Sequence, residues 1–129
     1  MASERPAPDR VVAFVCAHGA LRSRLAAALF NEVAPAGWTA ISAGLEPEAE
    51  LGETAGRLLA GTDARRFLDT SPPRALHSCD PAAAIVAIDC ELSGAEVWRL
   101  ENPAPCQAMV DELGRRVRDL AAHPIEKRV

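Results

Sequence analysis

The sequence predicts an α/β protein with three layers, in which a four-stranded parallel sheet carries helices on both faces. Two observations lead to this class. Short apolar runs rich in β-branched residues alternate along the chain with segments whose apolar residues recur at helical spacing. Parallel strands need crossover connections, which helices usually provide, so this alternation favours βαβ units.

The first strand and the first helix flank a short turn. Residues 11–15 form a continuous apolar run, which is typical of a buried strand. Residues 16–23 follow as a turn that contains Gly19. A helix is expected over residues 24–33, where leucine and alanine recur at helical spacing, and Pro35 ends it.

The remaining elements continue the alternation. Residues 38–42 and 83–88 are expected to form buried strands, and residues 95–100 a fourth strand. Helices are expected over residues 51–60 and, with clear amphipathic spacing, over residues 106–122. Since the carboxyl ends of parallel strands meet at one edge of a sheet, ligand-binding side chains are expected at that edge.

A single domain over residues 11–129 accounts for these elements. Residues 63–73 are expected to form a loop, residues 74–79 one helical turn, and the polar residues 1–10 a disordered lead-in. The sequence has neither an export signal nor an apolar run of about 18 residues, which predicts a cytoplasmic protein without a membrane span.

Charge and composition narrow the classes of function. The formal net charge of −4 argues against a surface that coats nucleic acid, because phosphate backbones are bound by basic patches. The cysteines form no C-x-x-C pair, and the sequence shows no cluster of metal ligands. We therefore expect no metal, no cofactor, and neither nucleic acid nor membrane among the partners.

The turn after the first strand contains the candidate nucleophile and the candidate anion-binding residues. Cys16 and Arg22 are separated by five residues, and Ser23 follows. A loop of this length between strand and helix can turn its backbone N–H groups inward and form an anion cradle at the helix N-terminus. Arg22 would grip two oxygens of a tetrahedral oxyanion, and Cys16 would be a thiolate nucleophile with Ser23 as its hydrogen-bond donor. The residues predicted to bind the oxyanion are Cys16, Ala17, His18, Gly19, Ala20, Leu21 and Arg22.

This stretch resembles a known family. Residues 15–23, V-C-A-H-G-A-L-R-S, are similar to the phosphate loop of the low-molecular-weight protein tyrosine phosphatases and of the thiol-coupled arsenate reductases that share their fold. Residues 41–44 resemble the family's S-A-G after the second strand, and residues 98–104, W-R-L-E-N-P-A, resemble the reductases' W-x-x-x-D-P-A. The resemblance extends over most of residues 11–122 and implies the fold of these phosphatases.

The resemblance implies covalent catalysis by Cys16. In a phosphatase, Cys16 attacks phosphorus to form a thiophosphate ester, and an Asp in the D-P loop protonates the leaving oxygen and then activates water. This phosphomonoester hydrolysis, on an aryl or protein phosphotyrosine, is the first hypothesis. In a reductase the same thiolate attacks arsenate, and a second thiol, from a small molecule or a redoxin, resolves the adduct. A third hypothesis is a catalytically weak module that binds the oxyanion only.

Two departures from the family pattern bear on these hypotheses. Gly19 stands where the family has a loop-bracing Asn, which predicts a more mobile loop. Asn102 stands at the position of the acid Asp, and an amide cannot serve as the general acid or base that hydrolysis uses. Glu101 and Asp89 are the candidate carboxylates to replace it.

Two further cysteines are candidates for the resolving thiol. Cys90 follows a strand end, and Cys106 lies on the Asn102 side of the expected pocket, whereas Cys79 is a weaker candidate. None has the spacing of the family's second cysteine, so an ordinary structural thiol is the more economical interpretation of each. His18 lies inside the loop, where such a side chain is expected to point outward.

Overall fold

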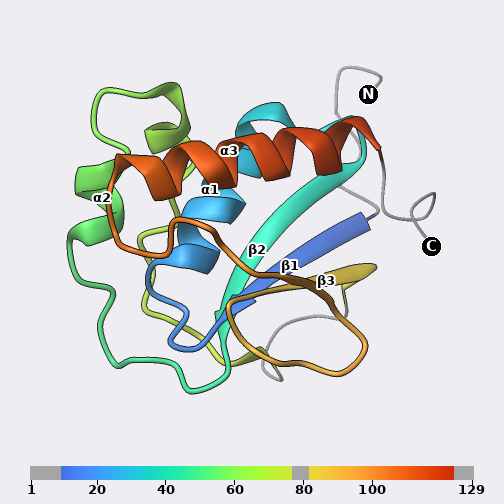
Figure 1. The fold of residues 1–129 in the computed structure, drawn as a ribbon, viewed down its shortest axis with the longest axis horizontal. Helices are drawn as coiled ribbons and strands as arrows, with labels where there is room; N and C mark the ends of the chain where they lie inside the picture. Colours follow the sequence, from blue (N-terminus) through green and yellow to red (C-terminus); the bar gives the residue numbers. More distant parts are fainter. Residues whose placement is uncertain (1–9, 77–81, 124–129) are drawn as a thin grey trace, which may run out of the picture.

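The structure is a computed structural model that describes residues 10–76 and 82–123 of the chain. Its centre is a sheet of four parallel strands in the order β2-β1-β3-β4 (Figure 1). The strands are β1 (Arg10–Cys16), β2 (Trp38–Gly44), β3 (Ala84–Ile88) and β4 (Glu96–Trp98). The predicted α/β class and the four-stranded parallel sheet are confirmed.

Helices follow β1, β2 and β4 along the chain. Within the described residues they are α1 (Arg22–Val33), α2 (Thr54–Leu58), the 3-10 helix η1 (Asp63–Phe67) and α3 (Gln107–Ala122). None of these helices has both the length and the apolar character that a membrane span requires.

The connection between β2 and β3 departs from the sequence predictions in its helices. A helix was expected over residues 51–60, but α2 is shorter because Gly52 and Gly61 adopt left-handed backbone angles, with φ of +77° and +80°. The expected loop over residues 63–73 begins instead with η1.

Strand ends also differ from the predictions. β4 stops at Trp98, because the N–H of Leu100 donates to the Asp89 side chain and not to a neighbouring strand. Ala75, expected in a helical turn, forms an isolated parallel bridge with Gly44. The rest of that turn, residues 77–79, and residues 1–9 of the lead-in lie outside the described residues.

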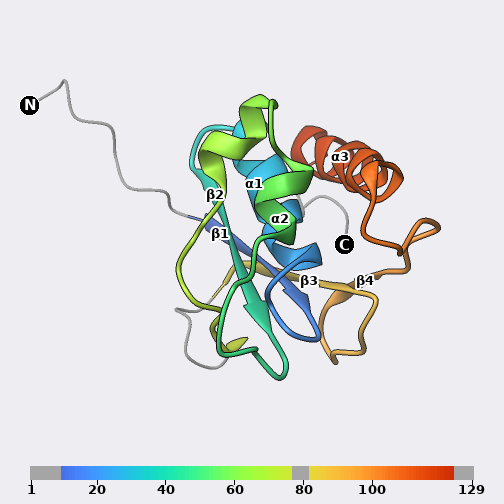
Figure 2. The ribbon, with the colours of Figure 1, turned by 90° about the vertical axis from the view of Figure 1, so that its left-hand side faces the viewer.

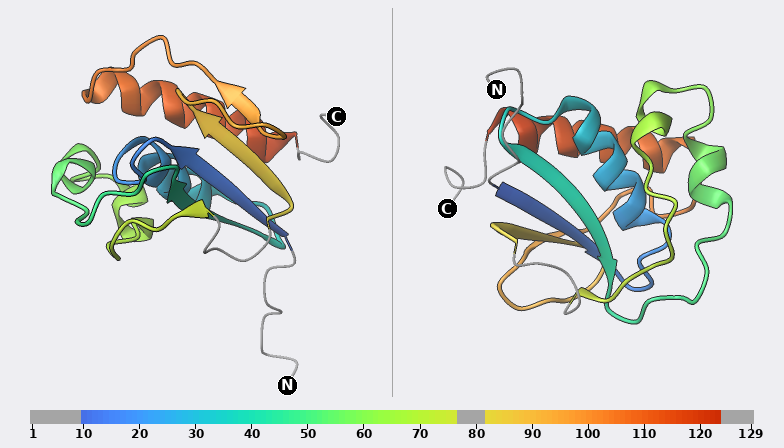
Figure 3. Two further views of the ribbon diagram at one scale, coloured as in Figure 1. Left: turned by 90° about the horizontal axis from the view of Figure 1, so that it is seen from below. Right: turned by 180° about the vertical axis from the view of Figure 1, so that it is seen from behind.

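The described helices gather on one face of the sheet. Figure 2 shows α1, α2 and α3 on the same side of the strands, and in the right-hand view of Figure 3 the strands stand in front of α1 and α3. α2 and η1 bury Ala55, Leu59 and Ala64 in the same core as α1 and α3.

This core fixes the strand that carries the site. Phe14 is fully buried on β1, and its ring centroid lies 6.0 Å from that of Phe30 and 5.7 Å from that of Trp98. β1 lies between β2 and β3, so Cys16 at its end is paired with Gly44 of β2. Because all strands are parallel, the residues that follow β1, β2 and β3 emerge at one edge of the sheet, as predicted.

Candidate active site

Cys16 ends β1 and faces the first turn of α1. Its Sγ and the Ser23 Oγ are 3.2 Å apart in a hydrogen bond, and the Ser23 backbone N–H donates to the same sulfur at 3.5 Å. Cys16 is 4% exposed, and Ser23 is fully buried. When the sulfur is a thiolate, both Ser23 groups donate to it at the positive end of a helix, an arrangement that stabilises the nucleophilic form.

The carbonyls of the loop between β1 and α1 point toward the segment that follows β2. Three backbone hydrogen bonds join them, from Leu45 to Cys16 (3.1 Å), from Glu46 to Ala17 (2.8 Å) and from Glu48 to His18 (3.1 Å). Because each peptide unit is planar and trans, the N–H that shares a peptide with each carbonyl points the opposite way. The N–H groups of residues 17–19 therefore point away from that segment, and within the described chain they have no acceptor. Unpaired amides of this kind are the donors that an anion cradle needs.

The loop and the end of β2 touch through two glycines. Gly19 has a φ of +70°, and a Cβ on it would lie 2.8 Å from the Gly44 nitrogen. A Cβ on Gly44 would lie 2.6 Å from the Gly19 nitrogen. Both values are too short for real contacts with backbone, so only glycine fits at either position.

Arg22 is held between two other segments. Its Nη2 donates to the carbonyl of Pro103 at 2.8 Å, and its Nε lies 3.6 Å from Asp89 Oδ2. Asp89 follows β3 with a φ of +53°, rare for a residue with a side chain, and its Oδ1 accepts from the Leu100 N–H. Arg22 Nε and Asp89 Oδ2 are both buried and have no hydrogen-bond partner.

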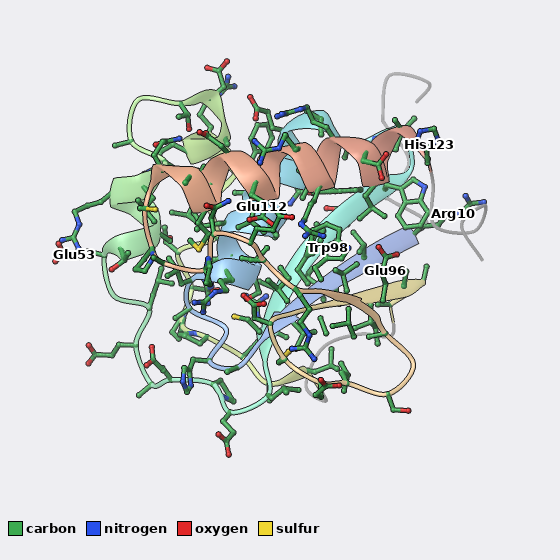
Figure 4. The ribbon with its side chains drawn as sticks, viewed as in Figure 1. Arg10, Glu53, Glu96, Trp98, Glu112 and His123 are labelled. Carbon is green, nitrogen blue, oxygen red and sulfur yellow. The ribbon has the colours of Figure 1, made fainter. Side chains whose placement is uncertain are left out.

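Asn102 is bonded to α3. Its backbone N–H and its Nδ2 donate to Glu112 Oε1 at 2.8 and 3.1 Å, and the N–H of Glu101 donates to Glu112 Oε2 at 2.9 Å. Glu112 is 4% exposed and reaches from α3 toward this segment (Figure 4). Burial opposes the charge of Glu112, but the hydrogen bonds from Glu101, Asn102 and Arg116 outweigh burial and lower its pKa.

The structure thus separates the predicted site residues into two groups. Cys16, Ser23, the loop amides and Arg22 lie together, and Asp89 joins them through Arg22. Glu101 is exposed, and the Asn102 side chain is occupied by Glu112.

The remaining predicted residues lie around this group. His18 is exposed, with Nδ1 3.3 Å from the Glu46 carbonyl oxygen. Cys106 is exposed and directly precedes α3. Cys90 is partly buried, with Sγ 3.6 Å from the carbonyl oxygen of Val15, the residue before the nucleophile. Cys79 lies outside the described residues.

Sequence reasoning missed two buried charged residues that hold the loops of the site. Arg24 is 1% exposed and donates through Nε to the Gly19 carbonyl at 3.0 Å. Glu112 holds the segment after β4, as described above. A signal was present for both, because each interrupts the apolar face of an amphipathic helix, next to Leu25 and Leu113 respectively.

Comparison with known proteins places the chain in a family. A search with family models and a search of curated proteins found no match. Among solved structures, the arsenate reductase from Archaeoglobus fulgidus DSM 4304 is 32% identical with a TM-score of 0.68, and the match covers 86% of this chain and 98% of that one. The chain belongs to the superfamily of low-molecular-weight protein tyrosine phosphatases and arsenate reductases.

Other members show how broad this superfamily is. A thioredoxin-dependent arsenate reductase from Corynebacterium glutamicum is 26% identical with a TM-score of 0.65, covering 88% of this chain and 60% of that one. A low-molecular-weight protein tyrosine phosphatase from T. tengcongensis is 18% identical with a TM-score of 0.65, covering 86% and 97%. The latter shows the shared fold alone.

The contact between Gly19 and Gly44 can be tested with a matched pair of variants. Gly19→Ala should weaken phosphate binding about tenfold or more and lower the melting temperature, because the new Cβ pushes the loop off the end of β2. Gly37→Ala is the control, since Gly37 has a φ of +86° but nothing within 4 Å of the added Cβ. It should show only the backbone strain of a left-handed alanine, about 1–2 kcal/mol, with unchanged phosphate affinity. Calorimetric titration and thermal unfolding give both readings, and wild-type phosphate affinity in Gly19→Ala would contradict the argument.

Proposed function

We propose that the protein is a thiol-dependent arsenate reductase, in which Cys16 attacks arsenate bound in the loop. The observation that carries this proposal is an ion pair beside the loop, between Arg22 Nε and Asp89 Oδ2 at 3.6 Å, in which neither buried atom has a hydrogen-bond partner. One is a donor and the other is an acceptor. A hydrogen arsenate ion, which has both acceptor oxygens and one O–H, can satisfy the two together.

A phosphomonoester dianion is a poorer match to the same pair. It has no O–H, so its oxygens would face the Asp89 carboxylate without a donor between them. The negative charges of the ester oxygens and of the Asp89 carboxylate would repel each other, and Asp89 Oδ2 would still lack a hydrogen-bond donor. Because this pair suits an oxyanion that carries an O–H, we prefer arsenate reduction to phosphomonoester hydrolysis, which was the first hypothesis from the sequence.

Cys90 supports the second half of the reaction. Its Sγ lies beside the residue that precedes the nucleophile, at the same edge of the sheet. Burial raises the pKa of the Cys90 thiol, and the negative charge of a nearby Cys16 thiolate raises it further. The thiolate form of Cys90 is therefore disfavoured while Cys16 carries a negative charge.

The proposed steps balance as follows. The Cys16 thiolate forms a bond to arsenic, and the O–H oxygen of hydrogen arsenate takes one further proton from solvent and leaves as water. Cys90 then loses its thiol proton to solvent and attacks the Cys16 sulfur, an S–S bond forms, and the electron pair of the S–As bond stays on arsenic. Arsenic is reduced from the +5 to the +3 state and leaves as arsenite. An external small thiol or redoxin supplies two electrons to reopen the disulfide.

Hydrolysis of phosphomonoesters is the second candidate. The loop amides and Arg22 suit any tetrahedral oxyanion, and a thiolate at Cys16 can attack phosphorus as well as arsenic. The missing element is a proton donor for the leaving oxygen, since Asn102 is an amide bonded to Glu112. Activated aryl esters need little protonation, so they are the phosphate substrates that we expect to react.

The Asp89 argument predicts a discrimination between anions. Arsenate and inorganic phosphate should protect Cys16 from alkylation by iodoacetamide at concentrations at least tenfold lower than phenyl phosphate does. Asp89→Ala should narrow this difference, because it removes the acceptor for the O–H and the repulsion of the ester. Equal protection by phosphate and phenyl phosphate in the wild type would contradict the assignment of the site to a protonated oxyanion.

The role of Cys90 predicts the outcome of a single turnover without added thiol. Wild-type protein should release one arsenite and form a Cys16–Cys90 disulfide, detectable by peptide mass spectrometry, whereas Cys90→Ser should stop before arsenite release. Because the Cys90 pKa is raised, the rate of disulfide formation should keep increasing from pH 7 to 9, following the thiolate fraction. Cys106→Ser is the control and should behave as the wild type, since Cys106 is exposed before α3. Arsenite release by Cys90→Ser at the wild-type rate would rule out this resolving thiol.

The bond between Asn102 and Glu112 makes a prediction about restoring an acid. Asn102→Asp alone should lower the melting temperature and gain little activity, because it places a second carboxylate about where the 3.1 Å bond to Glu112 now lies. Combining Asn102→Asp with Glu112→Gln returns a donor to that contact. The double variant should raise steady-state hydrolysis of an aryl phosphate by about tenfold or more, within the range of general acid–base catalysis. A single variant that gains as much as the double one would show that Glu112 does not constrain this position.

A further inference from the structure

We propose that Arg24 is a positioning residue of the oxyanion loop, which sets the direction of a loop amide by holding the carbonyl of Gly19. The inference rests on the proposed function only in requiring that the loop binds an oxyanion, a step that both candidate reactions share. Arg24 does not lie on the substrate side of the loop. It acts from inside the core, through the backbone.

The burial of Arg24 calls for a function that an apolar side chain could not supply. Arg24 is 1% exposed and is the largest fully buried side chain of the described chain. Burial lowers its pKa, a sign that the charged form is penalised there. Hydrocarbon side chains of similar volume are often more stable at such buried positions than ions are. A guanidinium at this place is therefore explained by its hydrogen bonds.

The bond from Arg24 completes the outer side of the loop. The carbonyls of residues 16–18 are held by the segment after β2, and the next carbonyl, that of Gly19, accepts from Arg24 Nε at 3.0 Å. Because the peptide is planar, fixing the Gly19 carbonyl also fixes the Ala20 N–H on the opposite side. Gly19 has no side chain and a φ of +70°, so its peptide needs an external partner to remain in one orientation.

The other end of the guanidinium is anchored firmly. Arg24 Nη1 donates to the Asp69 carbonyl at 2.5 Å and lies 3.7 Å from Asp69 Oδ1. Burial would raise the pKa of Asp69, but hydrogen bonds from Ser71 and Arg74 lower it to about 2. Asp69 therefore remains ionised at any pH at which the enzyme is assayed.

Arg74 connects this anchor back to the loop. Its Nη2 binds Asp69 Oδ2 at 2.7 Å, its Nη1 donates to the Ser42 carbonyl at 3.3 Å, and its own carbonyl accepts from the Gly44 N–H at 2.9 Å. Gly44 is the residue whose backbone touches Gly19. Arg24, Asp69, Arg74, Gly44 and Gly19 therefore contact one another in sequence around one side of the loop. We expect a substitution of Arg24 to shift the backbone N–H groups of the loop as well as the packing of the core.

The experiment compares Arg24 variants with a variant that is destabilised elsewhere on α1. Arg24→Met removes every hydrogen bond of the side chain, and Arg24→Lys keeps a charge that reaches Gly19 or Asp69 but not both. The control is Leu25→Ala, which opens a cavity at a fully buried apolar residue of the same helix and removes no hydrogen bond, since the Leu25 N–H that binds the Leu21 carbonyl is retained. Inorganic phosphate is the probe, and its affinity is measured by protection of Cys16 from iodoacetamide at a temperature where each variant is folded.

We expect Arg24→Met to weaken phosphate protection about tenfold or more and Arg24→Lys to weaken it severalfold, whereas Leu25→Ala lowers the melting temperature with unchanged protection. Wild-type protection in folded Arg24→Met and Arg24→Lys would overturn the proposal and make Arg24 a structural residue only. If Arg24→Met does not fold, Arg24→Lys decides alone. Failure of wild-type protein to bind phosphate or arsenate would instead overturn the proposed function.

Discussion

The site depends on the direction in which one short loop presents its peptide groups. The carbonyl and the N–H of a peptide point opposite ways, so an inward cradle of amides requires carbonyls that are held on the outer side. Backbone hydrogen bonds from the segment after β2 hold three of these carbonyls, and Arg24 holds the fourth. This arrangement brings two backbones into contact, which explains why Gly19 and Gly44 have no room for a side chain. The replacement of the family's Asn by Gly19 is therefore accompanied by a different brace.

Two buried charges set the shape of the site from the core. Arg24 acts on the loop after β1, and Glu112 acts on the segment after β4. Each burial costs several kcal/mol unless the charge is paired, and both charges are, with Asp69 and Arg116 respectively, although Arg24 Nη2 has no hydrogen-bond partner. Both bond to backbone groups, so the backbone geometry of the two segments depends on side chains that approach from the core.

The sequence predicted the sheet and the loop because both leave local patterns. Apolar runs located β1, β2 and β3, and the Cys16 to Ser23 spacing between a strand and a helix located the anion cradle. It did not predict the short α2 or the presence of η1, since both depend on where the chain between β2 and β3 finds an apolar surface to cover.

The sequence also did not predict what the Asn102 side chain contacts. Asn102 was identified only as a missing acid, whereas its bond to Glu112 joins two elements through tertiary packing. No spacing in the sequence encodes such a pair. The charged residues inside apolar helix faces were the available signal that a buried polar contact existed.

The position of Arg22 connects oxyanion binding to the segment after β4. A guanidinium has five N–H donors, and one of them is already used by the Pro103 carbonyl. The buried Nε has no hydrogen-bond partner, so an oxyanion can bind there without breaking the Pro103 contact. The segment that carries Pro103 is fixed in turn by Glu112, through the N–H groups of Glu101 and Asn102. Glu112 therefore supports the orientation of Arg22 from a distance, because the carbonyl that holds the Arg22 guanidinium belongs to the segment that Glu112 fixes.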